Sequence, residues 1–270
     1  EGNGRILVES AMLCFICPTA SAAGVVTSKL GGSLSDTVSY VVMINISVAL
    51  VVPLAIPIVN TASDVPFMTS FLAICMKIFP LLVLPLIIAW IVRYTMRRLQ
   101  RWLMRYTEWA FYCWGVALCF AIYLATRALV LSGLSVWVVL LIGVISLVCT
   151  LAQFGVGRAA GRICASKVNA DALRSGVLSR DSGSEVSLRD SGAVASSRNS
   201  GSDTELSAEV DKITAGQALG QKNTGFLIWL GYSYLTPVTS VAGGLYSVFQ
   251  NCINSFELYQ KEKQITKKIS

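Results

Sequence analysis

The stretch LSDTVSYVVMINISVALVVPLAIPIV, residues 34–59, decides the fold class of this chain. It is longer than the roughly 20 mostly apolar residues that an α-helix needs to cross about 30 Å of hydrocarbon. Similar apolar runs occupy 67–91, 109–131 and 136–156, and 238–258 is a fifth, more polar candidate. The chain is 54% hydrophobic and only 14% charged, whereas soluble domains carry about 25% charged residues. The sequence therefore predicts an all-α, multi-pass membrane protein.

Lysines and arginines gather in alternate connections between these runs. Segment 93–105 carries five arginines and 261–270 carries four lysines, whereas 60–66, 132–135 and 236–237 carry neither residue type. Because basic connections stay on the cytoplasmic side of a membrane, we expect a cell (inner) membrane protein with a cytoplasmic C-terminus. The position of the basic residues matters more than the net charge of +7, so no nucleic-acid partner is predicted.

The arginines of 93–105 are interleaved with Trp102 and Tyr106. Arginines and aromatic side chains together are typical of a helix that lies in the membrane interface on anionic lipid. Membrane lipid is therefore one expected partner.

The charge alternation also bears on the N-terminus. Followed backward, it places Glu1 on the outer side, yet neither a signal peptide nor an initiator Met precedes it. We expect the chain to lack an odd number of preceding transmembrane helices.

The eight cysteines include one closely spaced pair, Cys14-x-x-Cys17. Such a pair can hold a metal or a redox disulfide. The chain has no histidine and no second pair with matching spacing, so we interpret the cysteines as small packing residues. No metal site, cofactor or enzyme activity is predicted, since the apolar runs also lack paired carboxylates.

The composition changes abruptly at 165–211, which is rich in Ser, Gly, Asp and Arg. Short motifs that begin at Arg180, Arg189 and Arg198 recur there every nine residues. Because the repeats lack a regular apolar position, they predict a disordered cytoplasmic insert and no folded repeat domain.

Two membrane segments are interrupted. Segment 5–30 contains CPTASAAG at 17–24, and segment 213–235 contains GQKNTG at 220–225. Proline and glycine break helices, so the predicted break residues are Pro18, Gly24, Gly220 and Gly225. Discontinuous helices at matching places in two halves indicate a transporter binding site. The predicted substrate-binding or ion-binding residues are Ser21, Thr37, Gln221, Lys222, Asn223 and Thr224.

Lys222 is the most informative of these residues. A lysine near the membrane midplane costs roughly 2.5–3.5 kcal/mol on insertion scales and is usually functional or paired. Its ammonium group can stand in for a bound sodium ion, bind a carboxylate or sulfonate of the substrate, or extend to the cytoplasmic interface. A Walker-type phosphate loop is excluded because Gln221 separates Gly220 from the lysine.

Glu9 and Lys77 are predicted to be further buried charges. Lys77 lies in the middle of an apolar run, before Pro80 and Pro85. Two interpretations are equally open: a structural pair with a carboxylate such as Glu9 or with exposed carbonyls, and a role in transport.

Five motifs together resemble the bile acid:sodium symporter family. They are Cys17-Pro18 with the small residues that follow, Val52-Pro53 to Ile56-Pro57, Met76-Lys-Ile-Phe-Pro80, Gly220 to Gly225, and Gly244 to Asn251. The resemblance implies ten helices in two inverted five-helix repeats, in which the broken fourth and ninth helices cross.

By this resemblance the chain begins in the fourth helix and lacks the first three. Residues 1–59 then end the first repeat, with a broken helix at 5–30 and a helix at 34–59. Residues 60–164 hold the helices at 67–91, 109–131 and 136–156. After the insert, 212–260 hold the second broken helix and the final helix, and 261–270 form a basic cytoplasmic tail.

The chain departs from the family at its sodium ligands. The family's Ser and Asn in the first break fall on Ala23 and Gly24, and of two hydroxyls in the next helix only Thr37 remains. The family's Glu and Gln in the second break fall on Ala218 and Lys222. The resemblance thus implies a secondary active, symporter-like transporter of a small organic anion, with altered or absent sodium coupling. The alternative is a non-transporting membrane receptor or scaffold that retains the fold.

Overall fold

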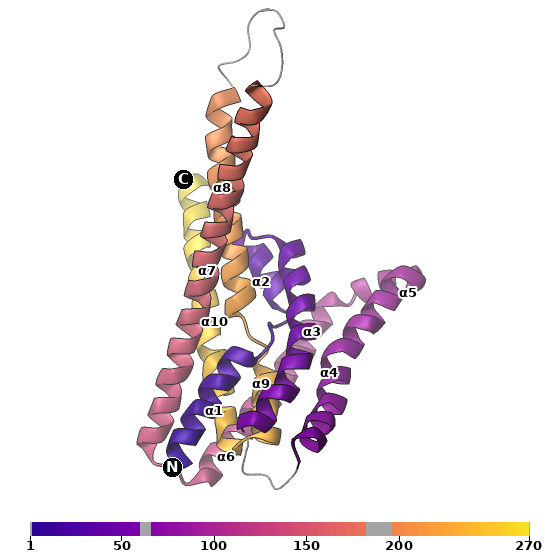
Figure 1. Ribbon diagram of the computed structural model, residues 1–270, viewed down its shortest axis with the longest axis vertical. Coiled ribbons are helices and arrows are strands. Elements are labelled where there is room, and N and C mark those ends of the chain that lie inside the picture. The colour runs from indigo at the N-terminus through magenta and orange to yellow at the C-terminus, as the bar shows by residue number, and fades with distance from the viewer. Residues whose placement is uncertain (1, 60–65, 182–195, 270) are drawn as a thin grey trace, which may run out of the picture.

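The computed structural model describes residues 2–59, 66–181 and 196–269, and these ranges are almost entirely helical, without a β-strand. The order of elements along the chain can be followed in Figure 1. The elements are α1 (Gly2–Ile16), α2 (Ala23–Leu30), α3 (Leu34–Val59), α4 (Phe67–Thr95), α5 (Arg97–Met104), α6 (Thr107–Ser132), α7 (Val136–Asp181), α8 (Ser196–Gly220), α9 (Thr224–Tyr234), the 3₁₀ turn η1 (Pro237–Thr239) and α10 (Ser240–Ile269).

Three described helices are long and apolar enough to cross a membrane. They are Leu34–Val59, Phe67–Thr95 and Val136–Lys167, and they contain the predicted runs at 34–59, 67–91 and 136–156. The predicted run at 109–131 lies in α6, whose described apolar part is the shorter Ile122–Ser132. The prediction of an all-α chain with membrane-length helices is confirmed at this level.

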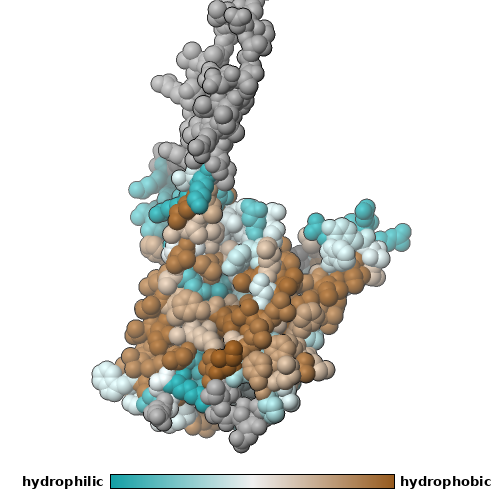
Figure 2. Space-filling model, in the orientation of Figure 1, coloured by the Kyte–Doolittle hydropathy of each residue, from teal (hydrophilic) through white to brown (hydrophobic). Residues whose placement is uncertain are grey.

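Large apolar side chains point outward from these helices. Met43, Met76 and Trp137 are 69%, 77% and 75% exposed. Figure 2 shows hydrophobic side chains as a belt across the middle of the visible face, with hydrophilic side chains gathered toward its ends. A continuous apolar belt of this kind is compatible with contact to lipid.

The connections sort to two ends of the helix bundle. One end in Figure 1 holds the start of α1, the end of α3, the start of α4 and the α6–α7 connection. α5, the end of α7, the start of α8 and the C-terminal end of α10 lie at the other. The α6–α7 connection, which lacks Lys and Arg, therefore lies opposite the arginines of α5 and the lysines at the C-terminal end of α10, as the positive-inside rule predicts for a protein that crosses a membrane.

The insert differs from its prediction. Segments 165–181 and 196–211 were predicted to be disordered, but they are the distal turns of α7 and α8, which run side by side as a helical hairpin (Figure 1). The part at 182–195 lies outside the described residues. The prediction of disorder rested on the high Ser and Gly content of 165–211. This segment contains no proline, so every residue in it keeps the N–H donor that a helix requires.

Glycines let α7 and α8 approach closely at the base of this hairpin. A Cβ atom on Gly157 would lie 2.4 Å from the carbonyl oxygen of Ala215, and one on Gly161 would lie 2.5 Å from that of Asp211. On α8, a Cβ atom on Gly216 would lie 2.6 Å from the side chain of Arg158. Small residues at four-residue spacing are the usual means of close helix contact in membranes.

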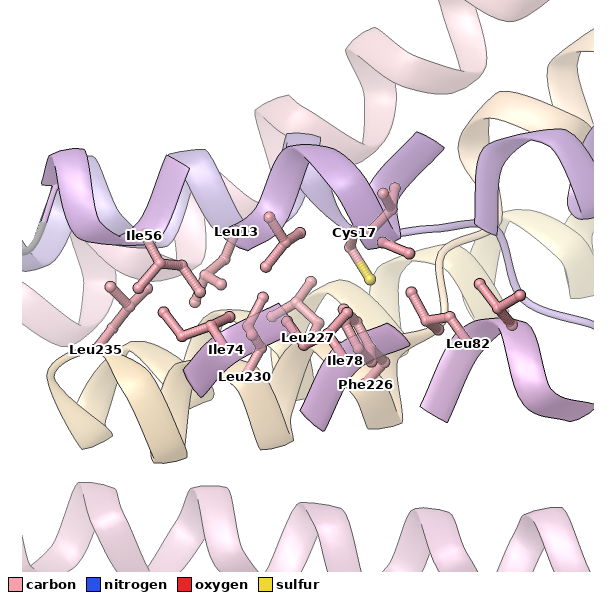
Figure 3. Close-up of a cluster of buried hydrophobic side chains, with 14 residues drawn as sticks. Leu13, Cys17, Ile56, Ile74, Ile78, Leu82, Phe226, Leu227, Leu230 and Leu235 are labelled. Atoms are coloured by element: carbon pink, nitrogen blue, oxygen red, sulfur yellow. The ribbon is translucent and has the colours of Figure 1, made fainter. Parts of the chain in front are cut away.

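Two apolar clusters fix α1 and α9 in the bundle. The first joins Leu13 of α1, Ile56 of α3, Ile78 of α4 and Leu230 of α9, as Figure 3 shows. The second joins an adjacent face of α1 to α7 and α10, around the fully buried ring of Tyr246. α1 is thus buried on two sides, which places its C-terminal end inside the protein.

α4 and α5 form the least buried part. α4 packs mainly on α3, and α5 has no buried residue. The arginines of α5 are all exposed, which agrees with the interfacial helix predicted for 93–105. Lipid contact of α5 stays a prediction.

Candidate functional site

Both predicted helix breaks are present. α1 ends at Ile16 and α2 begins at Ala23, while α8 ends at Gly220 and α9 begins at Thr224. These limits confirm the interruptions expected around Pro18 and between Gly220 and Gly225. Each break leaves backbone donors and acceptors without helical partners.

The two breaks bind each other through their backbones. The N–H of Ala20 donates to the carbonyl of Gln221 at 3.0 Å, and the N–H of Asn223 donates to the carbonyl of Pro18 at 2.8 Å. The pair forms a single antiparallel bridge. Segments about 200 residues apart in sequence therefore satisfy part of each other's backbone, which a buried break requires.

Side chains from other elements bind the last carbonyls of α8. The hydroxyl of Thr19 donates to the carbonyl of Ala218 at 2.6 Å, and the hydroxyl of Tyr246 donates to that of Gly220 at 2.8 Å. Orphan carbonyls at a helix end are costly when buried. These bonds allow α8 to end inside the protein.

Asn223 begins α9. Its side-chain oxygen accepts the N–H of Phe226 at 3.2 Å, as an N-cap does. Asn223 is also the central residue of an inverse γ-turn, with φ of −73° and ψ of 81°. The N–H of Thr224 closes this turn by donating to the carbonyl of Lys222 at 2.9 Å. Asn223 and the buried Thr224, both predicted site residues, thus shape the second break.

The peptide of Lys222 is also bound by α10. Its N–H donates to the side-chain oxygen of Gln250 at 2.9 Å, and its carbonyl accepts the amide of Gln250 at 3.4 Å. The lysine backbone therefore has partners on both its groups. Only its side chain remains for other chemistry.

The side chain of Lys222 is buried, with 2% exposure. Its ammonium group has no hydrogen-bond or ion-pair partner within the part of the chain that the structure describes. Lys222 follows the C-terminal end of α8. Cys17 follows the end of α1, and its thiol donates to the carbonyl of Asn223 at 3.1 Å, so the end of α1 lies beside the same break. The positive charge thus lies where two helices present their partly negative ends.

Two predicted site residues lie elsewhere. Ser21 is exposed on the first break. Thr37 is buried, but its hydroxyl donates to the carbonyl of Ser33 one turn back at 2.8 Å. Among the described residues, neither side chain is hydrogen-bonded to the second break.

Of the predicted break glycines only Gly220 borders a break, at the end of α8, whereas Gly24 lies within α2 and Gly225 within α9. A Cβ atom on Gly24 would lie 2.9 Å from Leu34, so this glycine lets α2 pack against α3. A Cβ atom on Gly220 would overlap the ring of Phe154 at 2.4 Å. A Cβ atom on Gly225 would have no neighbour closer than 3.7 Å, so a larger residue would fit at this position.

The prediction for the two buried charges is half wrong. Glu9 is fully buried, accepting Arg5 at 2.7 Å and the N–H of Thr236 at 3.0 Å. Lys77, in contrast, is exposed, and its ammonium lies 5.8 Å from the ring centre of Tyr234. Glu9 therefore pairs with Arg5, one turn away on the same helix, and not with Lys77.

A chain of polar side chains leads away from the second break. Gln221 donates to Gln217 and lies 3.4 Å from the oxygen of Asn254. Gln217 donates to Glu257 at 2.7 Å, and Glu257 forms an ion pair with Arg158. Buried side-chain amides thus connect the break to a charged pair near the basic end of the bundle.

Several contacting residues were missed from the sequence, chiefly Thr19, Tyr246 and Gln250. On α10, Tyr246, Gln250, Asn254 and Glu257 recur every three or four residues and face α8. The polar periodicity of the final helix indicates this stripe, whereas apolar runs carry no sign of it.

No family model, curated protein or solved structure matches this chain. The likeness to the bile acid:sodium symporter family therefore stays a prediction that rests on the quoted motifs. The geometry of the two breaks is independent of that likeness, since it follows from the hydrogen bonds described above.

Proposed function

We propose that this chain belongs to a secondary active transporter of a small organic anion, in which a fixed lysine replaces a mobile coupling cation. The observation that carries the proposal is the meeting of two broken helices at the buried Lys222. Broken helices that meet inside a helix bundle are the usual way in which transporters build a binding site. The resemblance to the bile acid:sodium symporter family supports the same function.

The position of Lys222 favours a structural cation. The C-terminal ends of helices each carry roughly half a negative charge, and α1 and α8 both end beside this residue. A sodium ion in such a place would neutralise these ends. An ammonium group on the chain supplies the same charge permanently, so transport needs no sodium.

The same junction favours an anionic substrate. α2 and α9 both begin there, at Ala23 and Thr224, and the N-terminal ends of helices attract anions. The cap residue of α2, Ala22, makes no side-chain capping bond. The N–H groups of Ala23, Thr224 and Phe226 are already bonded within the chain. A carboxylate or sulfonate at this place would therefore be bound mainly by the fixed positive charge and the helix dipoles.

Uptake into vesicles tests this function. The full natural chain is reconstituted into liposomes, and uptake of a radiolabelled bile salt, a steroid sulfate, pyruvate and pantoate is compared in sodium and in choline buffer. We expect uptake of at least one compound at equal rates in both buffers. Lys222→Met should abolish that uptake, whereas Lys29→Met, at an exposed lysine on α2, should not. Uptake that requires sodium would overturn the fixed-cation proposal.

One observation favours the alternative, a non-transporting receptor or scaffold. The backbone of Lys222 and two terminal carbonyls of α8 are already bound by the protein itself, which leaves fewer groups for a ligand. Binding of a tested anion without uptake would favour the receptor. Neither binding nor uptake of any of the four would favour the scaffold.

A further inference from the structure

A charged cavity of about 700 Å³ lies among basic residues of α7, α8 and α10, and none of its lining residues belongs to the helix breaks. α7, α8 and α10 form its walls, and the end of α2 closes one side. The described residues that line it carry four cationic and two anionic groups. They are Arg158, Arg162, Lys212, Lys261, Glu209 and Glu257.

Both carboxylates in this cavity already have partners. Glu257 pairs with Arg158, and Glu209 accepts Lys212 at 2.7 Å. No ion pair joins Arg162 or Lys261 to a carboxylate within the described ranges. The cavity thus keeps a surplus of two positive charges.

These cations lie close enough together that an anion between them would be favoured. Arg158 and Arg162 are four residues apart on α7 and line the same cavity, and like charges at this spacing repel. Lys261 of α10 faces them, with its ammonium group against the left-handed turn at Gly31 that ends α2. Three helices therefore bring positive charge to one space.

The cavity also has apolar walls. Leu30, Ile213 and Ile265 line it beside the cations. It lies near the end of the membrane-length segment Val136–Lys167, which contains both arginines. Lipid headgroups lie at this level of a membrane helix, and their first methylene groups lie just below.

We infer that this cavity binds a phosphate group, with the phosphate of an anionic phospholipid as the ligand that its mixed walls fit. Arg162 and Lys261 bind the phosphate oxygens through charge-assisted hydrogen bonds. The apolar residues contact the glycerol and the first methylene groups. This inference does not rest on transport, because none of these residues lies in the helix breaks.

Lipid binding by matched variants tests the inference. The full natural chain is delipidated in neutral detergent, and titrations with phosphatidylglycerol, phosphatidylcholine and inorganic phosphate are followed by thermal shift and native mass spectrometry. We expect phosphatidylglycerol to bind the natural chain, and Arg162→Gln with Lys261→Gln to weaken this binding about 30-fold. The control, Lys167→Gln with Lys263→Gln, removes two exposed charges from the same helices and should retain it.

Each further outcome has a defined meaning. A response to inorganic phosphate that the cavity variant loses would support a phosphate site whose ligand is soluble. Equal weakening in the control variant would overturn the inference, because net charge alone would then explain the binding. Equal binding of phosphatidylcholine would also overturn it. Arg162→Lys with Lys261→Arg keeps both charges and should bind, which guards against a variant that fails to fold.

Discussion

The side-chain amide of Gln250 binds both backbone polar groups of Lys222. Its oxygen lies 2.9 Å from the backbone nitrogen and its nitrogen 3.4 Å from the carbonyl oxygen. One side chain on α10 thus supplies what a continuous helix would have supplied at the break. Because both residues are buried, water cannot replace these bonds. The amide fixes the lysine backbone while leaving the ammonium group unbound.

Replacing this amide should destabilise the protein. Gln250→Leu leaves the buried N–H of Lys222 without its partner, which costs about 1–3 kcal/mol. The carbonyl of Lys222 loses only its longer bond and keeps the N–H of Thr224. We expect a loss of about 1–3 kcal/mol in the free energy of unfolding, measured by thermal or denaturant unfolding in detergent. Asn251→Leu, on the adjacent exposed position, is the control. Equal stability of the two variants would show that the amide bonds contribute little.

A second prediction concerns the contact of α7 with α8. Gly161→Ala places a methyl group 2.5 Å from the backbone of Asp211, and neither backbone can move aside easily. We expect a loss of about 1–3 kcal/mol, as for other overpacked sites. Gly155→Ala has no atom within 4 Å and should stabilise by up to about 1 kcal/mol through helix propensity. If Gly161→Ala and Gly155→Ala shift the apparent melting temperature in the same direction, the prediction is contradicted.

The sequence predicts the helix breaks better than it predicts their partners. Pro18 lacks a backbone N–H, and three glycines lie near Lys222, so local chemistry locates both interruptions. The bond from Thr19 to the carbonyl of Ala218 spans 199 residues. No local pattern reports such a contact, and it follows only when α1, α8 and α10 are packed together.

The fate of the charged residues depends on the same packing. Glu9 and Lys77 lie in similarly apolar surroundings in the sequence, yet one is buried and the other exposed. α1 is enclosed on two sides, whereas α4 packs mainly against one helix. Apolar periodicity could not separate the two cases, because a lipid-facing helix is apolar all round.

A third prediction concerns sidedness. The exposed Cys113, Cys119, Cys164 and Cys252 are replaced by Ser, and single cysteines are placed at Ser135 or Arg98. From the alternation of basic connections, an impermeant maleimide should label Ser135→Cys on intact cells. It should label Arg98→Cys only after permeabilisation. Labelling of Arg98→Cys from outside would contradict the predicted orientation.

The final prediction exchanges the fixed cation for a mobile one. Ala218 and Lys222 lie about one turn apart at the end of α8, and both are buried. Ala218→Glu with Lys222→Gln removes a positive charge and adds a carboxylate beside the ends of α1 and α8, so a cation from solution is needed to balance them. Sodium chloride should then raise the apparent melting temperature of this variant above that in choline chloride, and should not do so for the natural chain. Lys222→Gln alone lacks the carboxylate and should respond less. The recovered sodium affinity should be weak, because Ala23 and Gly24, the first residues of α2, offer no side-chain oxygen. A double variant that melts at the same temperature in both salts would show that the ammonium group of Lys222 does not stand in for a bound cation.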